Sequence, residues 1–419
     1  MNILYHHRTA GDRVERVHIM GIVRAFRSLG HTVLISSPPG CDPERPAHPC
    51  ANTTTPPRGG LRARLKNFAR RAPPVAFELA ELAYNFYALA DMLRLSRQAW
   101  PDLIYERTTA NSIAPTLLAR ILRVPIVQEV NVTADIGRLR PLVLSRLTHA
   151  IERWVLRHAA AQVTVSRRFR EMLIAAGLPG SNDALVSPNA VDADLFRPDV
   201  PLPEGAERFK PAESLVVGYV GAFVPYHGLE LLVEVAPRLT DRFPQCRWLL
   251  VGDGVMRAPI KEMLKSRGLR DVFILPGAVP HEQVPSFLRL MDVCVLPASN
   301  PHGSPMKIFE FMAMGRAVLA PRLGPMEEVV QDGVNGRLFA PGDLNDFAAK
   351  LAELLADADL RTRLGEQARR DVLARHTWEA NVRALLAHLA QRGVCLPRAD
   401  MKPGPQHALA VNRTMRAPA

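Results

Sequence analysis

The chain has 419 residues, 47% hydrophobic and 22% charged, which is the balance of a globular protein with a large core. No apolar run approaches the roughly eighteen residues of a membrane-spanning helix, which argues against an integral membrane protein. The net charge of +12 comes without any helix-turn-helix, zinc-finger or aromatic-interleaved basic motif, so we expect no nucleic acid partner and favour an anionic lipid or a phosphate-bearing substrate.

The first predicted unit is a strand, a helix and a second strand. Residues 1–8 begin directly as an apolar strand without a signal peptide, and the five cysteines form no metal spacing. We therefore expect a cytoplasmic protein with reduced thiols. A polar loop over residues 9–18 enters a helix that ends at Leu29, and residues 32–36 form the second strand, which completes one βαβ unit.

A basic segment follows this unit. Residues 38–60 are rich in Pro, Gly and Thr, which predicts a long loop. Within residues 61–71, Leu61, Leu65 and Phe68 share one helical face opposite five cations. Two interpretations remain open: an interfacial helix on an anionic membrane, or an ordinary surface helix of the first domain.

Alternating helices and strands complete the first half of the chain. They are predicted at residues 75–97 (helix), 102–106 (strand), 125–131 (strand), 138–160 (basic helix) and 162–166 (strand). We predict a Rossmann-like acceptor domain over residues 1–197, followed by a Pro- and Gly-rich linker over residues 198–212.

The second half repeats the pattern. A buried strand over residues 215–221 precedes a Gly-containing loop and a helix from Leu229, an arrangement that directs free N–H groups at an anion. We predict a second Rossmann-like domain over residues 213–375. A helix over residues 376–392 is expected to return to the first domain, and the tail over residues 393–419 is expected to be disordered.

Residues 297–319 are predicted to form the end of a strand, a loop and a short helix. The loop leaves the carboxyl end of a buried strand, where ligands bind in open α/β sheets. Pro305 suits the first helical position and Gly315 closes the helix. The free N–H groups of the first turn, together with Lys307, favour an anion, and Glu310 lies one turn further on the same side. The alternative is an ordinary solvated Lys–Glu pair.

This stretch resembles the signature of the family-four glycosyltransferases, nucleotide-sugar-dependent enzymes of the two-domain GT-B fold. The match consists of Gly303-Ser304-Pro305, Glu310 and the segment 312–318. The resemblance implies that Glu310 holds the ribose of the donor. The first acidic position of the signature is His302 here, so Lys307 becomes the expected contact to the donor phosphates. The donor-site residues that the resemblance implies in this stretch are Gly303, Ser304, Pro305, Met306, Lys307 and Glu310.

Three further positions depart from the family pattern. The two cations that clasp the pyrophosphate in the family fall on Ala222, directly after Gly221, and on His227. The resemblance implies that His227, helix N-termini and Lys307 meet the phosphate charge instead. Asn131 stands where the family commonly has a His, which leaves a hydrogen-bonding group without an acid–base function.

Two other stretches complete the resemblance. Glu15 and His18 keep the spacing of the family's Glu-x-x-His on the acceptor side; the alternative is a helix N-terminal charge and a partly buried His. Residues 188–196 are similar to the family's interdomain segment. They contain Asp192 and Asp194 at the spacing of metal-dependent, single-domain glycosyltransferases, but two consecutive βαβ halves argue against that fold, so we expect no metal and no cofactor.

Together these features predict an α/β protein of the GT-B fold, with two Rossmann-like doubly wound domains facing each other across a cleft. The resemblance implies retaining transfer of a sugar from a nucleotide diphosphate sugar to a glycan or polyprenyl-linked acceptor in surface polysaccharide or glycoconjugate synthesis, with Lys307, Glu310 and His227 as catalytic residues. Peripheral association with the inner membrane face is also expected. The alternatives are a catalytically impaired GT-B sugar-nucleotide-binding protein and a sugar-nucleotide epimerase.

Overall fold

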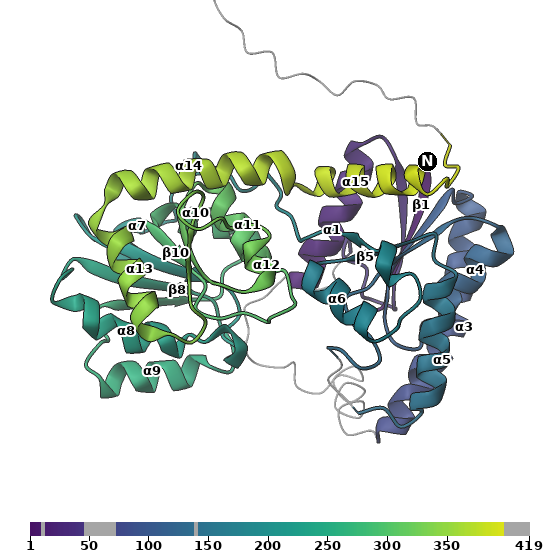
Figure 1. The fold of residues 1–419 in the computed structure, drawn as a ribbon, viewed down its shortest axis with the longest axis horizontal. Helices are drawn as coiled ribbons and strands as arrows, with labels where there is room; N and C mark the ends of the chain where they lie inside the picture. Colours follow the sequence, from purple (N-terminus) through teal and green to yellow (C-terminus); the bar gives the residue numbers. More distant parts are fainter. Residues whose placement is uncertain (10–12, 46–72, 138–140, 398–419) are drawn as a thin grey trace, which may run out of the picture.

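The structure, a computed structural model, describes residues 1–9, 13–45, 73–137 and 141–397. Two α/β halves lie side by side, and α14 and α15 run end to end across the top of both (Figure 1). The predicted two-domain α/β architecture is confirmed. The basic segment 61–71 lies outside the described residues, as does most of the C-terminal tail. Among the described residues, no helix is long and apolar enough to cross a membrane.

The first half is a six-stranded parallel sheet in the order β2-β1-β3-β4-β5-β6, with helices packed against it. Its inner strands β1, β3, β4 and β5 are short and almost fully buried, which is the pattern of a parallel sheet between helices, whereas the edge strands β2 and β6 are partly exposed. Its elements are β1 (Asn2–His7), α1 (Arg13–Ser28), β2 (Thr32–Ser36), α3 (Pro74–Gln98), β3 (Leu103–Arg107), α4 (Ala114–Leu122), β4 (Ile126–Glu129), α5 (Ser145–Arg157), β5 (Ala161–Thr164), α6 (Arg167–Ala175), η1 (Ser181–Asp183) and β6 (Leu185–Val186).

The second half is a six-stranded parallel sheet in the order β12-β11-β10-β7-β8-β9. Its elements are α7 (Ala206–Phe209), β7 (Leu215–Val220), η2 (Pro225–His227), α8 (Glu230–Thr240), β8 (Cys246–Val251), α9 (Arg257–Ser266), β9 (Phe273–Gly277), η3 (His281–Gln283), α10 (Val284–Leu290), β10 (Val293–Val295), α11 (Met306–Ala313), β11 (Ala317–Pro321), α12 (Gly324–Glu327), β12 (Arg337–Phe339), α13 (Leu344–Ala356) and α14 (Ala358–Arg375).

Each sheet has one point where the strand order reverses. In the first sheet this point lies between β1 and β3, and in the second sheet it lies between β7 and β10. Chain leaving the carboxyl ends of two such strands diverges to opposite faces, which opens a crevice where ligands bind in doubly wound folds. The two reversal points therefore mark where each half offers a site.

Helix α15 (Trp378–Gln391) returns to the first half and packs on α1. Trp378, Val382 and Leu385 are buried in the same apolar cluster as the inner face of α1. The close approach depends on Gly21, because a Cβ at that position would lie only 2.4 Å from the indole of Trp378. Burial of these apolar side chains joins the last helix to the first domain.

Three local expectations are wrong. Helix α1 already begins at Arg13, so Glu15 and His18 lie on a helix and not in a loop; an acidic residue in the first turn suits the helix dipole. The predicted helix 138–160 is replaced by the shorter α5, and Pro141, which cannot donate a backbone hydrogen bond, precedes it. Pro305 is extended, with ψ of 119°, and stands just before the first residue of α11.

Candidate active site

Lys307 is held in a buried cluster at the reversal point of the second sheet. Its Nζ donates to the hydroxyl of Tyr219 at 2.8 Å and lies 4.4 Å from the centre of the Tyr219 ring. The same Nζ lies 3.3 Å from Nε2 of His227. Lys307 comes from the first turn of α11, Tyr219 from β7 and His227 from η2. We call Tyr219, His227 and the carbonyl of Ala222 the lysine cradle.

The cradle fixes the proton positions of His227. Nδ1 of His227 lies 2.7 Å from the carbonyl oxygen of Ala222, which can only accept, so Nδ1 carries the proton. Nε2 is then free to accept from Lys307. Burial, followed by the nearby charge of Lys307, lowers the pKa of His227 to about 4, which keeps this imidazole neutral. His227 therefore orients Lys307 and adds no positive charge of its own.

Burial also acts on Lys307 itself. The side chain is 9% exposed, and this burial lowers its pKa to about 7, while Glu310 acts in the opposite direction. A buried ammonium without a full counter-charge is costly, and an anion bound beside it removes that cost. The cradle therefore holds a cation that gains from a bound phosphate.

Gly221 provides the space above Lys307. Its φ of 145° is rarely adopted by residues with a side chain, and an added Cβ would lie 2.7 Å from Nζ of Lys307. The backbone at the end of β7 can thus approach the lysine closely. Ala222, the next residue, contributes only its carbonyl to the cradle, in a position where the resemblance expects an Arg.

Glu310 diverges from Lys307 and is held by a residue that the sequence analysis missed. Oε1 of Glu310 lies 2.8 Å from Nε2 of His281, in the short helix η3 after β9. Burial alone would lower the pKa of His281, but the hydrogen bond and charge of Glu310 outweigh it and raise the pKa. The pair fixes the position of the Glu310 carboxylate near the carboxyl edge of the second sheet. The alternative interpretation, an ordinary solvated Lys–Glu pair, does not hold, because both side chains are buried.

The residues predicted on the two sides of the cleft do come together. A cleft of about 210 Å³ is lined by residues of both halves. Those predicted from the sequence are Glu15, His18, Asn131, Gly303, Ser304 and Met306. The lining does not include the predicted residues Lys307, Glu310, His227 and Gly221. They lie in the second half, where Lys307 directly follows the cleft residue Met306 in the chain. Pro305 directs the loop into α11 and does not line the cleft.

Asn189 ties the two halves together at the floor of this cleft. Its backbone N–H donates to Oγ of Ser304 at 3.0 Å, and its side-chain amide donates to the Ser304 carbonyl. Its Oδ1 then faces Nδ1 of His18 at 2.9 Å. His302, at the signature's first acidic position, stacks on Phe169 with a centroid separation of 5.5 Å. The interdomain segment therefore links the donor loop to α1.

Glu129, at the end of β4, organises the acceptor side. This carboxylate is 1% exposed and accepts from the Tyr105 hydroxyl at 2.8 Å and from Arg107 at 2.6 Å. It also lies 2.9 Å from Nε2 of His18 and accepts from the amide of Asn131. Burial would raise the pKa of Glu129, but His18 and Arg107 together lower it well below its usual range. Glu129 thus orients both His18 and Asn131 toward the cleft.

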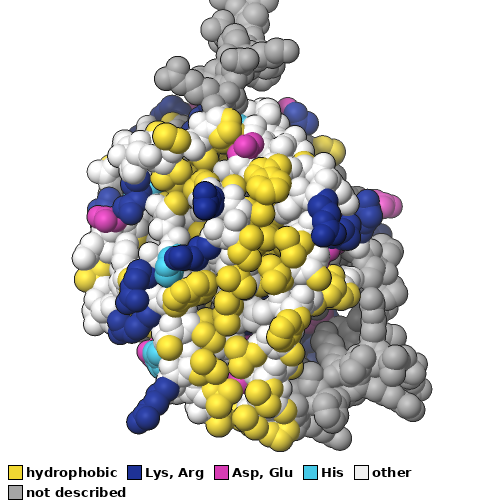
Figure 2. Space-filling view, turned by 90° about the vertical axis from the view of Figure 1, so that its right-hand side faces the viewer, with side chains coloured by type: hydrophobic (Ala, Val, Ile, Leu, Met, Phe, Trp, Pro, Cys, Tyr) yellow, Lys and Arg dark blue, Asp and Glu magenta, His cyan; other side chains and the backbone are white. Residues whose placement is uncertain are grey.

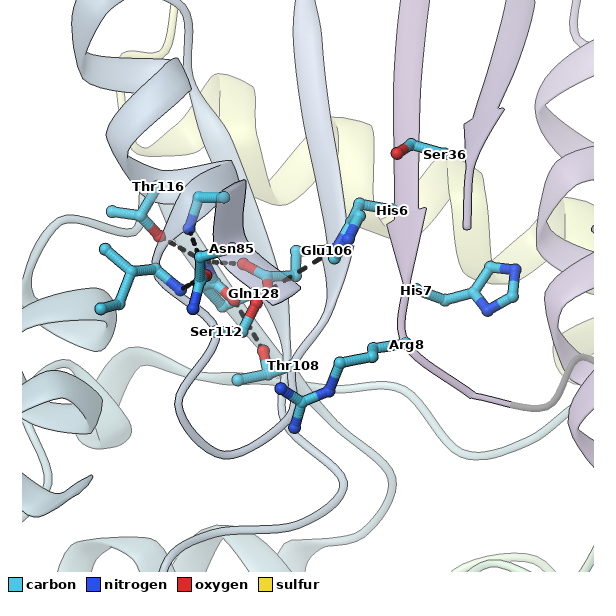
Figure 3. A network of polar contacts seen from close by, with 12 residues as sticks. His6, His7, Arg8, Ser36, Asn85, Glu106, Thr108, Ser112, Thr116 and Gln128 are labelled. Atoms are coloured by element: carbon cyan, nitrogen blue, oxygen red, sulfur yellow. Dashed lines mark hydrogen bonds and ion pairs between the residues drawn. The ribbon is translucent and has the colours of Figure 1, made fainter. Parts of the chain in front are cut away.

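A second polar network lies at the reversal point of the first sheet (Figure 3). Glu106 on β3 accepts from Gln128 at 2.9 Å and from Ser112, and its Oε1 lies 3.8 Å from Nδ1 of His6 on β1. Burial raises the pKa of Glu106 to about 7 and lowers that of His6 to about 3. A proton taken up by this pair therefore resides on Glu106 and not on His6, and Glu106 changes its charge near pH 7.

The Asp-x-Asp spacing does not form a metal site in this structure. Oδ1 of Asp192 accepts from the backbone N–H groups of Asp194 and Leu195, at 3.2 and 3.1 Å, and Oδ2 lies 3.6 Å from Arg24. Asp192 thus closes a local turn. Within the part of the chain that the structure describes, no three His, Cys, Asp or Glu side chains converge as metal ligands.

Comparison with known proteins shows to which family the chain belongs. Residues 15–190 match the family described as "Glycosyl transferase 4-like domain", and residues 204–371 match "Glycosyl transferases group 1". An alpha-D-kanosaminyltransferase of Streptomyces kanamyceticus is 31% identical over 268 residues, which cover 62% of this chain and 68% of that protein. The chain belongs to the group 1 glycosyltransferases.

Other relatives of this glycosyltransferase differ in their named activities. A glycogen synthase of Mycobacterium tuberculosis is 27% identical over 412 residues, 94% of each chain. Among solved structures, Anabaena HepE in complex with UDP superimposes with a TM-score of 0.67 at 18% identity, over 93% of this chain and all of that one. This structural likeness shows the GT-B fold.

Proposed function

We propose that this glycosyltransferase moves a hexose from a nucleoside diphosphate sugar, with retention at the anomeric carbon, to a glycan or lipid-linked acceptor. The observation that carries the proposal is the buried Lys307 in its cradle beneath Gly221, one helical turn from the Glu310–His281 pair. A cation and a ribose-binding carboxylate at this spacing suit the two ends of a nucleoside diphosphate. Named relatives such as the kanosaminyltransferase support sugar transfer.

The chemistry follows from stabilising the departing diphosphate. As the bond from the anomeric carbon to the diphosphate breaks, negative charge grows on the leaving oxygen, and Lys307 and the first N–H groups of α11 are oriented toward it before reaction. The acceptor hydroxyl transfers its proton to the leaving diphosphate on the same face of the sugar. His18 suits a positioning role, because both of its ring nitrogens already face acceptors.

The acceptor side supports a membrane-associated substrate. The first half carries the cleft residues Glu15, His18 and Asn131, and the chain as a whole has a net charge of +12. An acceptor on a lipid carrier would bring this half against an anionic leaflet, where each nearby cation contributes about 1 kcal/mol. Peripheral membrane association is therefore part of the proposed function.

The test is incubation of purified protein with a panel of nucleotide sugars, followed by mass spectrometry. Slow release of free sugar and nucleoside diphosphate from one donor is the expected result. Lys307→Ala should abolish it, whereas Lys265→Ala, an exposed lysine on α9, should not. A product that remains a sugar nucleotide with inverted stereochemistry would favour an epimerase and contradict the proposal.

A further inference from the structure

The outward face of α3 is apolar. Every exposed residue between Val75 and Ala90 is Val, Ala, Leu, Phe or Tyr, over about four helical turns. Phe86 is 82% exposed and Leu79 54%. A surface helix ordinarily turns polar residues to the solvent and apolar residues to the core. Because α3 also buries Met92 and Leu95 against the sheet, it carries apolar residues on both sides, and its buried residues include the polar Glu78 and Ser96.

Neighbouring helices extend this stripe into a patch. Oδ1 of Asn85 on α3 accepts from the backbone N–H groups of residues 113 and 114 at the start of α4. Glu78 accepts from the backbone N–H groups of residues 143 and 144, directly before α5. The patch, which we call the outer face, includes Val75, Leu79, Phe86, Tyr87, Ile121 and Leu147. Figure 2 shows it as a continuous band of hydrophobic side chains flanked by basic ones.

The exposed charged residues of α3, α4 and α5 all have one sign. Six exposed arginines lie on α3, α4 and α5, and none of the exposed residues of these helices is acidic. The acidic residues of α3 are at most partly exposed: Glu81 pairs with Arg8 at 2.9 Å, and Asp91 accepts from Ser36 at 2.8 Å and also pairs with Arg94 at 2.7 Å. The arginines are Arg94, Arg97, Arg120, Arg146, Arg153 and Arg157. An apolar centre with a purely cationic rim matches the layers of an anionic bilayer.

This charge pattern favours a bilayer over other occupants. A second copy of the chain would bring an identical cationic rim against the first, with no opposite charge to meet it. The chain's own segment 46–72 carries six basic residues and no acidic one, so it does not complement the rim either. Anionic headgroups satisfy the arginines while acyl chains cover Phe86 and Leu79.

The outer face also reaches the edge of the sheet that holds the cleft. Arg8, directly after β1, donates to Glu81 on α3 and to the carbonyl of Ala110, after β3. The first turns of α3, with Val75 and Leu79, therefore lie near the carboxyl ends of β1 and β3. A bilayer on this face would hold a lipid-linked acceptor next to the acceptor side.

We propose that the outer face of α3, α4 and α5 docks this glycosyltransferase on an anionic lipid bilayer. The proposal rests on the lipid-linked acceptor of the proposed function, and it assigns the docking to described apolar residues. Docking combines insertion of Phe86 and Leu79 below the headgroups with attraction between the arginine rim and anionic lipid. Either contribution alone gives weak, reversible binding.

Co-sedimentation with vesicles tests the docking. Wild-type protein should bind vesicles of phosphatidylglycerol and phosphatidylcholine, and should bind pure phosphatidylcholine far less. Two double variants, Leu79→Asp/Phe86→Asp and Arg97→Glu/Arg120→Glu, should each bind vesicles about tenfold or more weakly. Added salt should weaken vesicle binding by the wild type. Leu79→Ser with Phe86→Ser separates lost insertion from added repulsion and should also weaken binding.

Matched controls keep the outcome clear. Leu202→Asp and Val334→Asp change apolar residues that are 48% and 40% exposed in the other half, and should bind vesicles like the wild type. The proposal is wrong if the double variant Leu79→Asp/Phe86→Asp binds vesicles as well as the wild type does. It is also wrong if the wild type is a dimer that does not bind vesicles and this double variant is a monomer. Donor hydrolysis in solution should be unchanged in this pair, so a failure of the glycosyltransferase assignment would show separately as absent wild-type hydrolysis.

Discussion

The ammonium group of Lys307 donates to the hydroxyl of Tyr219 at 2.8 Å, across the point where the second sheet reverses its strand order. We expect Lys307→Ala and Glu310→Ala each to lower transfer by roughly two to three decades, since a charge-assisted contact to a phosphate or ribose is worth about 2–4 kcal/mol. Steady-state kinetics on folded variants measures this. Wild-type rates in either variant would remove this loop from the donor site.

The pH dependence of Lys307 gives a second prediction. Its pKa of about 7 lies below the ordinary value of 10.5, so between these limits the unfolded chain binds more protons than the folded one. This group therefore makes the free enzyme more stable as pH rises from about 7 toward 10, and Lys307→Met should remove that part of the dependence. Denaturant titrations at pH 7 and 9.5 compare the two proteins.

A bound nucleoside diphosphate should raise the pKa of Lys307, so binding takes up a proton near pH 8. Calorimetry in buffers of different ionisation enthalpy detects this proton uptake.

Gly221 offers a test of the close approach between backbone and lysine. An alanine there would place its Cβ 2.7 Å from Nζ of Lys307 and force an unfavourable φ, so Gly221→Ala should weaken donor binding strongly. Gly268→Ala is the matched control, because that glycine has a φ of +68° but no atom within 4 Å of an added Cβ. Isothermal titration with a nucleoside diphosphate distinguishes them. If both variants bind the nucleoside diphosphate with similar affinity, the close contact between the added Cβ and Lys307 does not affect donor binding, and the prediction is wrong.

The network in Figure 3 predicts a pH-dependent stability of opposite sign. Burial raises the pKa of Glu106 from 4.5 to about 7, so the folded state binds the extra proton and stability falls as pH rises through this window. The loss should be about 3 kcal/mol, at 1.36 kcal/mol per pKa unit. Glu106→Gln should flatten the dependence, whereas Glu106→Leu should destabilise at every pH, because Ser112 loses its acceptor and the amide of Gln128 keeps only Thr116. Equal pH slopes for the wild type and Glu106→Gln would contradict a neutral Glu106.

The sequence alone predicted the elements whose signals are local. The apolar run that ends at Pro297 and the helix end at Gly315 place the loop between them at the end of a strand. Lys307 then stands out as a cation at a helix N-terminus. What remained unpredicted depends on contacts between distant segments. The partner of Glu310 is His281, twenty-nine residues earlier, in the segment after β9, and β9 is separated from β10 in the sheet by β7 and β8. Strand-end positions after each predicted strand would have made His281 a candidate.

Glu129 and Tyr219 illustrate the same limit. In the sequence each is one residue within a buried strand, and nothing nearby marks Glu129 as the partner of His18 or Tyr219 as the partner of Lys307. A charged residue near the end of an apolar strand is a usable signal, because burial of a charge requires a partner. The outer face was not predicted, because apolar residues along a helix do not by themselves show which of its sides meets the core.

Chelation gives the last prediction. In the proposed donor site, the groups expected to face the phosphates are Lys307, its cradle and the N–H groups of α11, all positive or dipolar, whereas hard divalent cations require oxygen ligands. Asp192 is engaged in a local turn and near Arg24, and its neighbour Asp194 is exposed. Transfer activity should therefore survive dialysis against EDTA within about twofold, and Asp194→Asn should match the wild type, because Lys307 supplies the charge that a metal would otherwise bring. Complete loss of activity in EDTA, with recovery on adding manganese or magnesium, would show that the donor diphosphate arrives with a cation that Lys307 does not replace.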